Sequence, residues 1–213
     1  MTHSLHRLGT RQSLENDYVF LATPAIGFNE KGSGCKLKKI VDIVYKAEPV
    51  NIGSYEVGTV LAGASVELIR EKIADGSRVR CVFSDIEAVQ QVVEELVKAD
   101  LGISIVVSGL VDEIFEMAQR IGLQPHTVNF SSGIQGRVDR LPERPILDLV
   151  SMSGHGMVSA AVVERLVGDV LKGRSSPTEA ARTMAKPCVC GIFNQQRAEA
   201  LIGSIVRDRQ STE

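Results

Sequence analysis

Residues 78–133, RVRCVFSDIEAVQQVVEELVKADLGISIVVSGLVDEIFEMAQRIGLQPHTVNFSSG, alternate between short β-branched runs and longer amphipathic segments. The runs at 78–83, 103–107 and 126–130 have the length and composition of strands. The two segments between them repeat apolar residues at helical spacing and end at Gly102 and Gly122, and Asp85 is the expected cap of the first segment. Strand, helix, strand, helix, strand with short connections predicts parallel strands joined by right-handed crossovers.

The remaining segments extend this pattern. Further strands are expected at 17–22, 49–53 and 146–150. Further helices are expected at 37–44, at 158–171 and after the capping residues Ser65, Ser176 and Asn194. We therefore predict an α/β fold, namely a three-layer, Rossmann-like open sheet of mostly parallel strands. The C-terminal helices would pack on this sheet as cover or as the surface of a homodimer.

The length of 213 residues suits a single domain with a sizeable core. We place an α/β domain at 15–206, of which 157–206 is a helical C-terminal part. Residues 1–14 have little apolar content and are predicted to be a flexible lead-in, and 207–213 a polar tail.

Composition narrows the classes of partner. The net charge of −2 and the absence of Trp argue against nucleic acid, because neither a basic surface nor a base-stacking surface is available. The sequence has no apolar stretch long enough for a membrane span and no signal-peptide pattern at its start, which predicts a cytoplasmic protein. Its four cysteines do not form a disulfide-framework pattern, so free thiols are expected.

Two glycine-rich segments invite comparison with phosphate-binding loops. The loop Gly27–Gly34 lacks the Lys of a Walker loop, so a flexible surface loop is favoured over an anion-binding lid. Gly154-x-Gly156-x-x-Ser159, after a predicted strand, resembles a relaxed dinucleotide fingerprint. Because no strand ending in an acid follows about 20 residues later, an anion or phosphate site is favoured over nicotinamide or flavin, and the cofactor stays unidentified.

Two cysteines and a histidine form the most reactive combination in the chain. Cys188 and Cys190 precede a helix start, where the helix dipole favours thiolate, and His155 lies between two glycines and is free to project. In one interpretation a cysteine is a nucleophile and His155 its proton partner. In a second, these residues bind zinc or iron, with Cys35 or His126, although Cys-x-Cys is tighter than the common zinc spacing. In a third, all three are structural.

The ends of parallel strands share one edge of a sheet, which predicts where a ligand would bind. We expect ligand contacts from seven residues near strand ends and helix starts: Ser108, Gly109, Asn129, Ser132, Gly154, Gly156 and Asn194. Cys81 is expected to be an inert core thiol, and His126 to be structural.

These residues predict an enzyme that acts on a small anionic metabolite by group transfer or bond cleavage. The alternatives are a non-catalytic protein that binds a small molecule or a phosphate-bearing cofactor, and a Cys/His metal-binding protein. Thiol reactivity would separate the enzyme from the binding protein.

Overall fold

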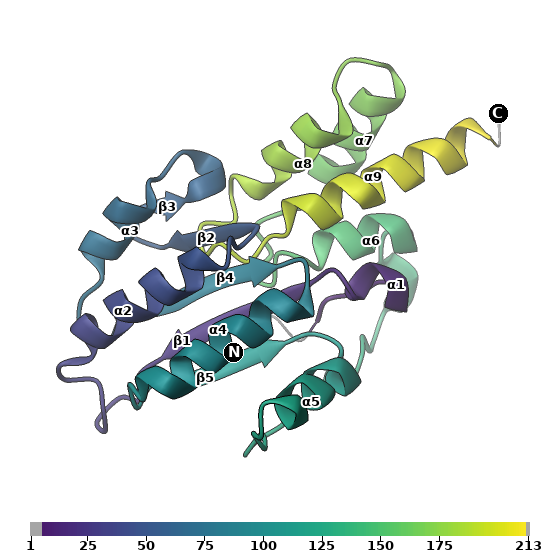
Figure 1. The fold of residues 1–213 in the computed structure, drawn as a ribbon. Helices are drawn as coiled ribbons and strands as arrows, with labels where there is room; N and C mark the ends of the chain where they lie inside the picture. The colour runs from purple at the N-terminus through teal and green to yellow at the C-terminus, as the bar shows by residue number, and fades with distance from the viewer. Residues whose placement is uncertain (1–5, 212–213) are drawn as a thin grey trace.

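The computed structural model describes residues 6–211 and contains one five-stranded sheet with the strand order β3-β2-β4-β1-β5 (Figure 1). The strands are β1 (Tyr18–Thr23), β2 (Asn51–Ser54), β3 (Gly58–Thr59), β4 (Val79–Phe83) and β5 (Ser104–Ser108). The helices are α1 (Arg11–Leu14), α2 (Ser33–Lys46), α3 (Val66–Lys72), α4 (Ile86–Ala99), α5 (Val111–Arg120), α6 (Arg144–Val150), α7 (Ala160–Leu171), α8 (Pro177–Ala185) and α9 (Gln195–Gln210). Two 3-10 turns cover Val60–Ala62 and Val138–Arg140.

The prediction of a mostly parallel, Rossmann-like sheet is wrong. Every pair of neighbouring strands is antiparallel: β1 with β4 and β5, and β2 with β3 and β4. β4 and β5 do run in the same direction and are joined through α4, as the 78–108 pattern indicates. However, β1 from the start of the chain lies between them and pairs with both. Pairing between strands so distant in sequence leaves no trace in local periodicity, which is why the pattern was misleading.

Two further segments that were predicted to be strands have a different structure. Residues 126–130 form no strand and are exposed, so their β-branched and aromatic residues do not join the sheet. Residues 146–150 belong to α6, which has Pro145 in its first turn and an Arg144–Asp148 ion pair one turn apart. Proline at a helix start was the local signal that favours helix over strand for this short apolar run.

The predicted helix starts at the four capping residues are confirmed. Ser65 accepts a hydrogen bond from the Leu68 amide, and Asn194 accepts one from the Arg197 amide. Asp85 caps α4, and Ser176 forms a capping box with Glu179 at the start of α8. These caps satisfy amides that have no partner inside the helix.

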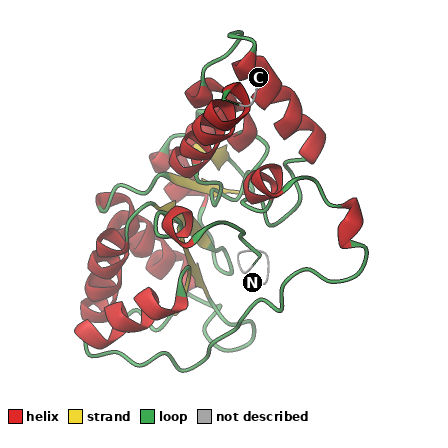
Figure 2. Ribbon diagram, turned by 90° about the vertical axis from the view of Figure 1, so that its right-hand side faces the viewer, coloured by secondary structure: helices red, strands yellow, loops and turns green. Residues whose placement is uncertain are grey.

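The sheet separates two apolar cores, and Figure 2 shows the strands between two groups of helices. Alternate residues of a strand face opposite sides. Phe20 and Cys81 pack with α2 and α4, whereas Val19 and Val82 pack with the helices from α6 to α9. The C-terminal helices therefore do pack on the sheet, on the face opposite α2 and α4.

No helix within residues 6–211 combines the length and the apolar character needed to cross a membrane. Residues 1–5 of the predicted lead-in and 212–213 of the predicted tail lie outside the described residues.

Candidate functional site

The turn 188–191 between α8 and α9 lies directly against β2. A Cβ atom at Gly191 would lie 2.2 Å from the Gly53 nitrogen, and one at Gly53 would lie 2.7 Å from the Val189 carbonyl oxygen. Gly191 also has φ of +79°, a conformation that favours glycine. Two glycines thus allow the two backbones to touch, which holds both cysteines of the turn against the sheet.

The two cysteines of this turn form a close thiol pair. Their Sγ atoms are 3.6 Å apart, and each residue is only 1 % exposed. Cys188 also contacts the hydroxyl of Ser153, while Cys190 accepts hydrogen bonds from the Ile192 amide and from His155. We call Cys188, Cys190, Ser153 and His155 the thiol cluster. Ser153 and His155 come from the loop between α6 and α7, so the cluster joins two distant segments.

The two thiols have opposite pKa shifts. The hydrogen bond from Cys188, followed by the Ile192 amide and His155, lowers the pKa of Cys190 to about 5, against the opposing effect of burial. The same thiol–thiol bond and burial raise the pKa of Cys188. We assign the thiolate to Cys190 because it has two further stabilising contacts, from a backbone amide and an imidazole. Of the two sulfurs, Cys190 is therefore the one that ionises first.

Aromatic and cationic groups surround the exposed side of the thiol cluster. The Tyr55 hydroxyl lies 3.1 Å from His155 Nε2, and the two rings meet edge to face with centroids 6.0 Å apart. The Arg80 guanidinium lies 4.3 Å from the centre of the Tyr55 ring. Arg80 is 5 % exposed, and its charge interacts with Cys190, which opposes the lowering of the Arg80 pKa by burial. The positive charge of the buried Arg80 thus acts on Cys190.

A second polar group, which we call the ion cluster, consists of Arg7, Asp17, Asn194 and Arg197. The Asp17 carboxylate accepts hydrogen bonds from Arg7 at 2.7 Å and 2.8 Å, from Arg197 at 2.7 Å and from Asn194 at 3.1 Å. The three charged side chains are nearly fully buried. Arg197 also bonds Ser13 and the Leu8 carbonyl, so the cluster ties the start of the chain to α9.

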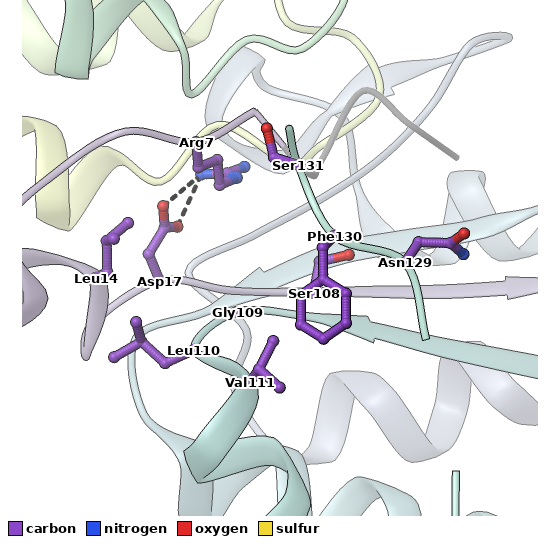
Figure 3. Close-up of a pocket in the computed structure, with 10 residues that line it drawn as sticks. All are labelled: Arg7, Leu14, Asp17, Ser108, Gly109, Leu110, Val111, Asn129, Phe130 and Ser131. Carbon is purple, nitrogen blue, oxygen red and sulfur yellow. Dashed lines mark hydrogen bonds and ion pairs between the residues drawn. The ribbon is translucent and has the colours of Figure 1, made fainter. Parts of the chain in front are cut away.

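A cavity of about 110 Å³ opens beside the ion cluster, where β5 ends and α5 begins. Figure 3 shows Arg7 and Ser131 on one side of it and Leu110 and Val111 on the other. Ser108, Gly109 and Asn129 also line the cavity and offer polar side chains or backbone groups to it. Gly109 is required here because a Cβ would lie 2.5 Å from the Tyr18 ring.

The residues expected at the site from sequence fall into four places. Cys188, Cys190 and His155 lie together in the thiol cluster, with Gly154 and Gly156 exposed on either side of His155. Ser108, Gly109 and Asn129 lie together in the cavity, whereas Asn194 is buried in the ion cluster and Ser132 is exposed outside the cavity lining. The thiol cluster and the ion cluster are connected through Ile192, whose amide donates to Cys190 and whose carbonyl accepts a hydrogen bond from Arg7.

The single edge on which all these residues were expected does not exist. In an antiparallel sheet the carboxyl ends of the strands alternate between two edges. Thr23 at the end of β1 pairs with Ser104 at the start of β5, while Ser108 pairs with Val19. The cavity therefore lies at the edge where β5 ends and β1 begins.

The two glycine-rich segments do not form phosphate loops. The strand expected before Gly154 is helix α6, and α7 begins only after Ser159, which caps it, so the dinucleotide geometry is absent. In the other loop the amides of Gly32 and Gly34 each donate to the Asp75 carboxylate at 2.8 Å. These amides, chiefly that of Gly34, lower the pKa of Asp75. The Asp75 carboxylate therefore already accepts the amide hydrogen bonds that an external anion would need.

The geometry does not support the metal alternative. Within residues 6–211, no group of three or more His, Cys, Asp or Glu side chains is placed to hold a metal ion. Cys35 is exposed on α2, on the opposite face of the sheet from the thiol pair, and His126 is exposed and bonds its neighbour Thr127. Neither side chain joins the two cysteines.

Sequence reasoning did not identify Arg80 and Tyr55 beside the thiol cluster, or Arg7, Asp17 and Arg197 in the ion cluster. Arg80 offered a signal, since it is a charged residue within the apolar strand 79–83, where a buried charge needs a partner. Tyr55 offered none, because its partner His155 lies 100 positions away in the chain. Arg7 pairs with Asp17 only 10 positions away, but its bond to the Ile192 carbonyl spans 185 positions.

Comparisons of the chain with protein-family models, with curated proteins and with solved structures found no significant match.

Proposed function

We propose that this chain is an enzyme in which the Cys190 thiolate attacks a small anionic metabolite and His155 transfers the proton. The observation that supports this most directly is the set of hydrogen bonds that Cys190 receives from Cys188, the Ile192 amide and His155. The thiolate is the nucleophilic form of cysteine, and these donors favour it near neutral pH. The result of attack would be group transfer from, or cleavage of, a bond in the metabolite.

The position of His155 fits a proton-transfer role. A nucleophile, a base within hydrogen-bonding reach and a third group that orients the base form the general arrangement of nucleophilic catalysis. Here Cys190, His155 and Tyr55 occupy those positions in that order. His155 and Tyr55 are both exposed, so a substrate would approach the buried sulfur from their side.

The charge of the surroundings favours an anionic substrate of small size. Arg80 makes no ion pair with a carboxylate among the described residues and lies near Cys190. A cation held in a partly desolvated position stabilises negative charge that develops on a substrate. Because Cys190 is only 1 % exposed, a bulky molecule would not reach its sulfur.

Alkylation of the native protein tests this proposal. Iodoacetate and iodoacetamide differ in charge, and peptide mass spectrometry reports each cysteine separately. We expect the ratio of iodoacetate to iodoacetamide reactivity to be severalfold higher at Cys190 than at the exposed Cys35, which serves as an internal control. His155→Ala should lower this ratio, whereas His126→Ala should not. A Cys190 that reacts more slowly than Cys35 with both reagents at pH 6 would contradict the proposal.

Turnover provides the direct test. The protein is incubated with mixed small carboxylates and phosphate esters, and consumption is followed by mass spectrometry. We expect Cys190→Ser to lose any turnover that the wild-type protein shows. Circular dichroism checks that this variant is still folded. Turnover that survives in this variant would assign the chemistry elsewhere.

A second candidate function, a non-catalytic binding protein for a small anion, is favoured by the cavity. The ion cluster beside it carries two guanidinium groups and one carboxylate, and the Arg7 Nε atom has no hydrogen-bond partner. The first turn of α5 has no side-chain cap there, and a helix N-terminus attracts anions. Calorimetric titration with inorganic phosphate should then show binding that Asn129→Ala weakens and Asn16→Ala does not. Binding that is absent, or equal in both variants, would remove this candidate.

A further inference from the structure

The Cys188–Cys190 pair has the geometry of a dithiol that can close to a disulfide. Both cysteines are free, and their sulfurs are 3.6 Å apart on either side of Val189. A disulfide requires about 2.05 Å, so closure needs an approach of roughly 1.5 Å. Neither Cys35 nor Cys81 lies beside another cysteine in this way: Cys35 is exposed on α2 and Cys81 is buried in β4.

The two sulfurs differ in the partners that surround them. Cys190 accepts from the Ile192 amide and from His155 and lies near the charge of Arg80, whereas Cys188 has Ser153 and its partner thiol. A dithiol that reduces an oxidant needs one sulfur that attacks and one that resolves the product. The contacts assign attack to Cys190 and resolution to Cys188.

The burial of both sulfurs limits the oxidant. Each cysteine is 1 % exposed, and the contact between Gly191 and Gly53 leaves no space for a protein disulfide to approach from the β2 side. Small hydroperoxides and small dithiols are far smaller than a protein disulfide, so burial favours small reagents over protein partners. Arg80 and His155 can stabilise the negative oxygen that leaves when the O–O bond breaks.

We propose that the chain reduces small hydroperoxides, with Cys190 as the peroxide-reactive residue and Cys188 as the resolving residue. This activity depends on the Cys190 thiolate of the proposed function. It adds a hydroperoxide as a second class of substrate.

The chemistry balances in two steps. First, the Cys190 thiolate attacks the terminal peroxide oxygen, the O–O bond breaks, and the leaving oxygen takes a proton from His155, which regains it from solvent, to form an alcohol, or water from hydrogen peroxide. Cys190 is thereby oxidised by two electrons to a sulfenic acid. Second, the Cys188 sulfur attacks the Cys190 sulfur, the S–O bond breaks, and the hydroxyl group leaves with the Cys188 proton as water. An external dithiol returns the disulfide to two thiols by exchange.

The full reduced chain, treated with one equivalent of hydrogen peroxide, tests the proposal. Four free thiols should fall to two, and the peptide that contains both cysteines should lose two hydrogens while Cys35 and Cys81 stay reduced. In Cys188→Ser, Cys190 should instead accumulate as a sulfenic acid that dimedone traps. With excess dithiothreitol, the wild-type protein should consume many equivalents of peroxide. The rate of peroxide consumption should be at least tenfold lower in Cys190→Ser.

The outcomes separate this proposal from the proposed function. Oxidation of Cys35 before the pair, or a disulfide that joins two chains through Cys35, would overturn the peroxide activity. If Cys190 reacts with iodoacetate as expected yet forms no disulfide with peroxide, the thiolate stands and the reductase proposal fails. If Cys190 reacts with neither reagent, both proposals fail.

Discussion

The ion cluster and the thiol cluster meet at Ile192 but differ in how their charges are balanced. In the ion cluster the Asp17 carboxylate is compensated by two guanidinium groups and an amide. In the thiol cluster hydrogen bonds from Cys188, the Ile192 amide and His155 lower the pKa of the Cys190 thiol. A fully paired carboxylate stabilises a fold, whereas a sulfur whose thiolate form is favoured can react as a nucleophile. This contrast is why we place stability in the first cluster and chemistry in the second.

Removal of the Asp17 charge should produce the largest effect and should leave the thiols unchanged. Asp17→Asn leaves two buried guanidinium groups without a carboxylate, which costs about 3–5 kcal/mol of unfolding free energy. The matched control is Asp42→Asn, which removes the exposed ion pair with Arg70 and costs about 0–1 kcal/mol. Urea denaturation measures both. Equal costs for the two variants would mean that the ion cluster is not the main electrostatic support of the fold.

Addition of one methyl group to the turn should have the next largest effect. Gly191→Ala places a Cβ 2.2 Å from the Gly53 nitrogen at a positive φ, and we expect a loss of about 3 kcal/mol. Gly122→Ala is the control, because Gly122 also has positive φ but open space around it, and its cost should be about 1 kcal/mol. Only the Gly191 variant should also change the alkylation rate of Cys190. If both variants cost the same, the close contact between the turn and β2 is absent.

Removal of the Cys188 thiol should change reactivity more than stability. Since hydrogen bonding lowers the pKa of Cys190, its thiolate is present above about pH 5 and lost as the pH falls through that value. Cys188→Ala removes the strongest donor, so the pKa should rise. Alkylation of Cys190 at pH 5 should fall about fivefold or more, because one pKa unit is a tenfold change in ionisation. Iodoacetamide rates measured from pH 4 to 9 report the midpoint.

The control for this variant is Cys81→Ala. Burial alone raises the pKa of Cys81, so its thiol should stay unreactive in the native protein, and its removal should not move the Cys190 midpoint. Cys81 and Cys190 are almost equally buried, and only Cys190 has donors around its sulfur. A midpoint that is the same in all three proteins would show that Cys188 does not stabilise the thiolate.

Local patterns predicted those parts of the fold that depend on neighbours in the chain. The caps at Ser65, Asp85, Ser176 and Asn194 were readable because each bonds an amide two or three residues away. Short apolar runs were less reliable, since a run of five residues such as 146–150 suits a strand or a helix.

The sequence suggested that Cys188, Cys190 and His155 lie together, but the reason for that expectation was wrong. A common edge of parallel strands was expected to gather them, but the sheet is antiparallel. Their actual meeting depends on the packing of the turn 188–191 against Gly53 and on the loop that carries His155.

Local sequence was enough to predict most of the helices, several of their caps, most of the strands and the residue types capable of thiol chemistry, because these follow from periodicity and side-chain chemistry within a few residues. Long-range packing alone places β1 between β4 and β5, brings Arg80 and Tyr55 to the thiol cluster, and brings Arg7 to Asp17 and Ile192. Strand pairing and buried polar contacts join residues far apart in the chain. Their energies depend on burial and geometry that no local pattern records.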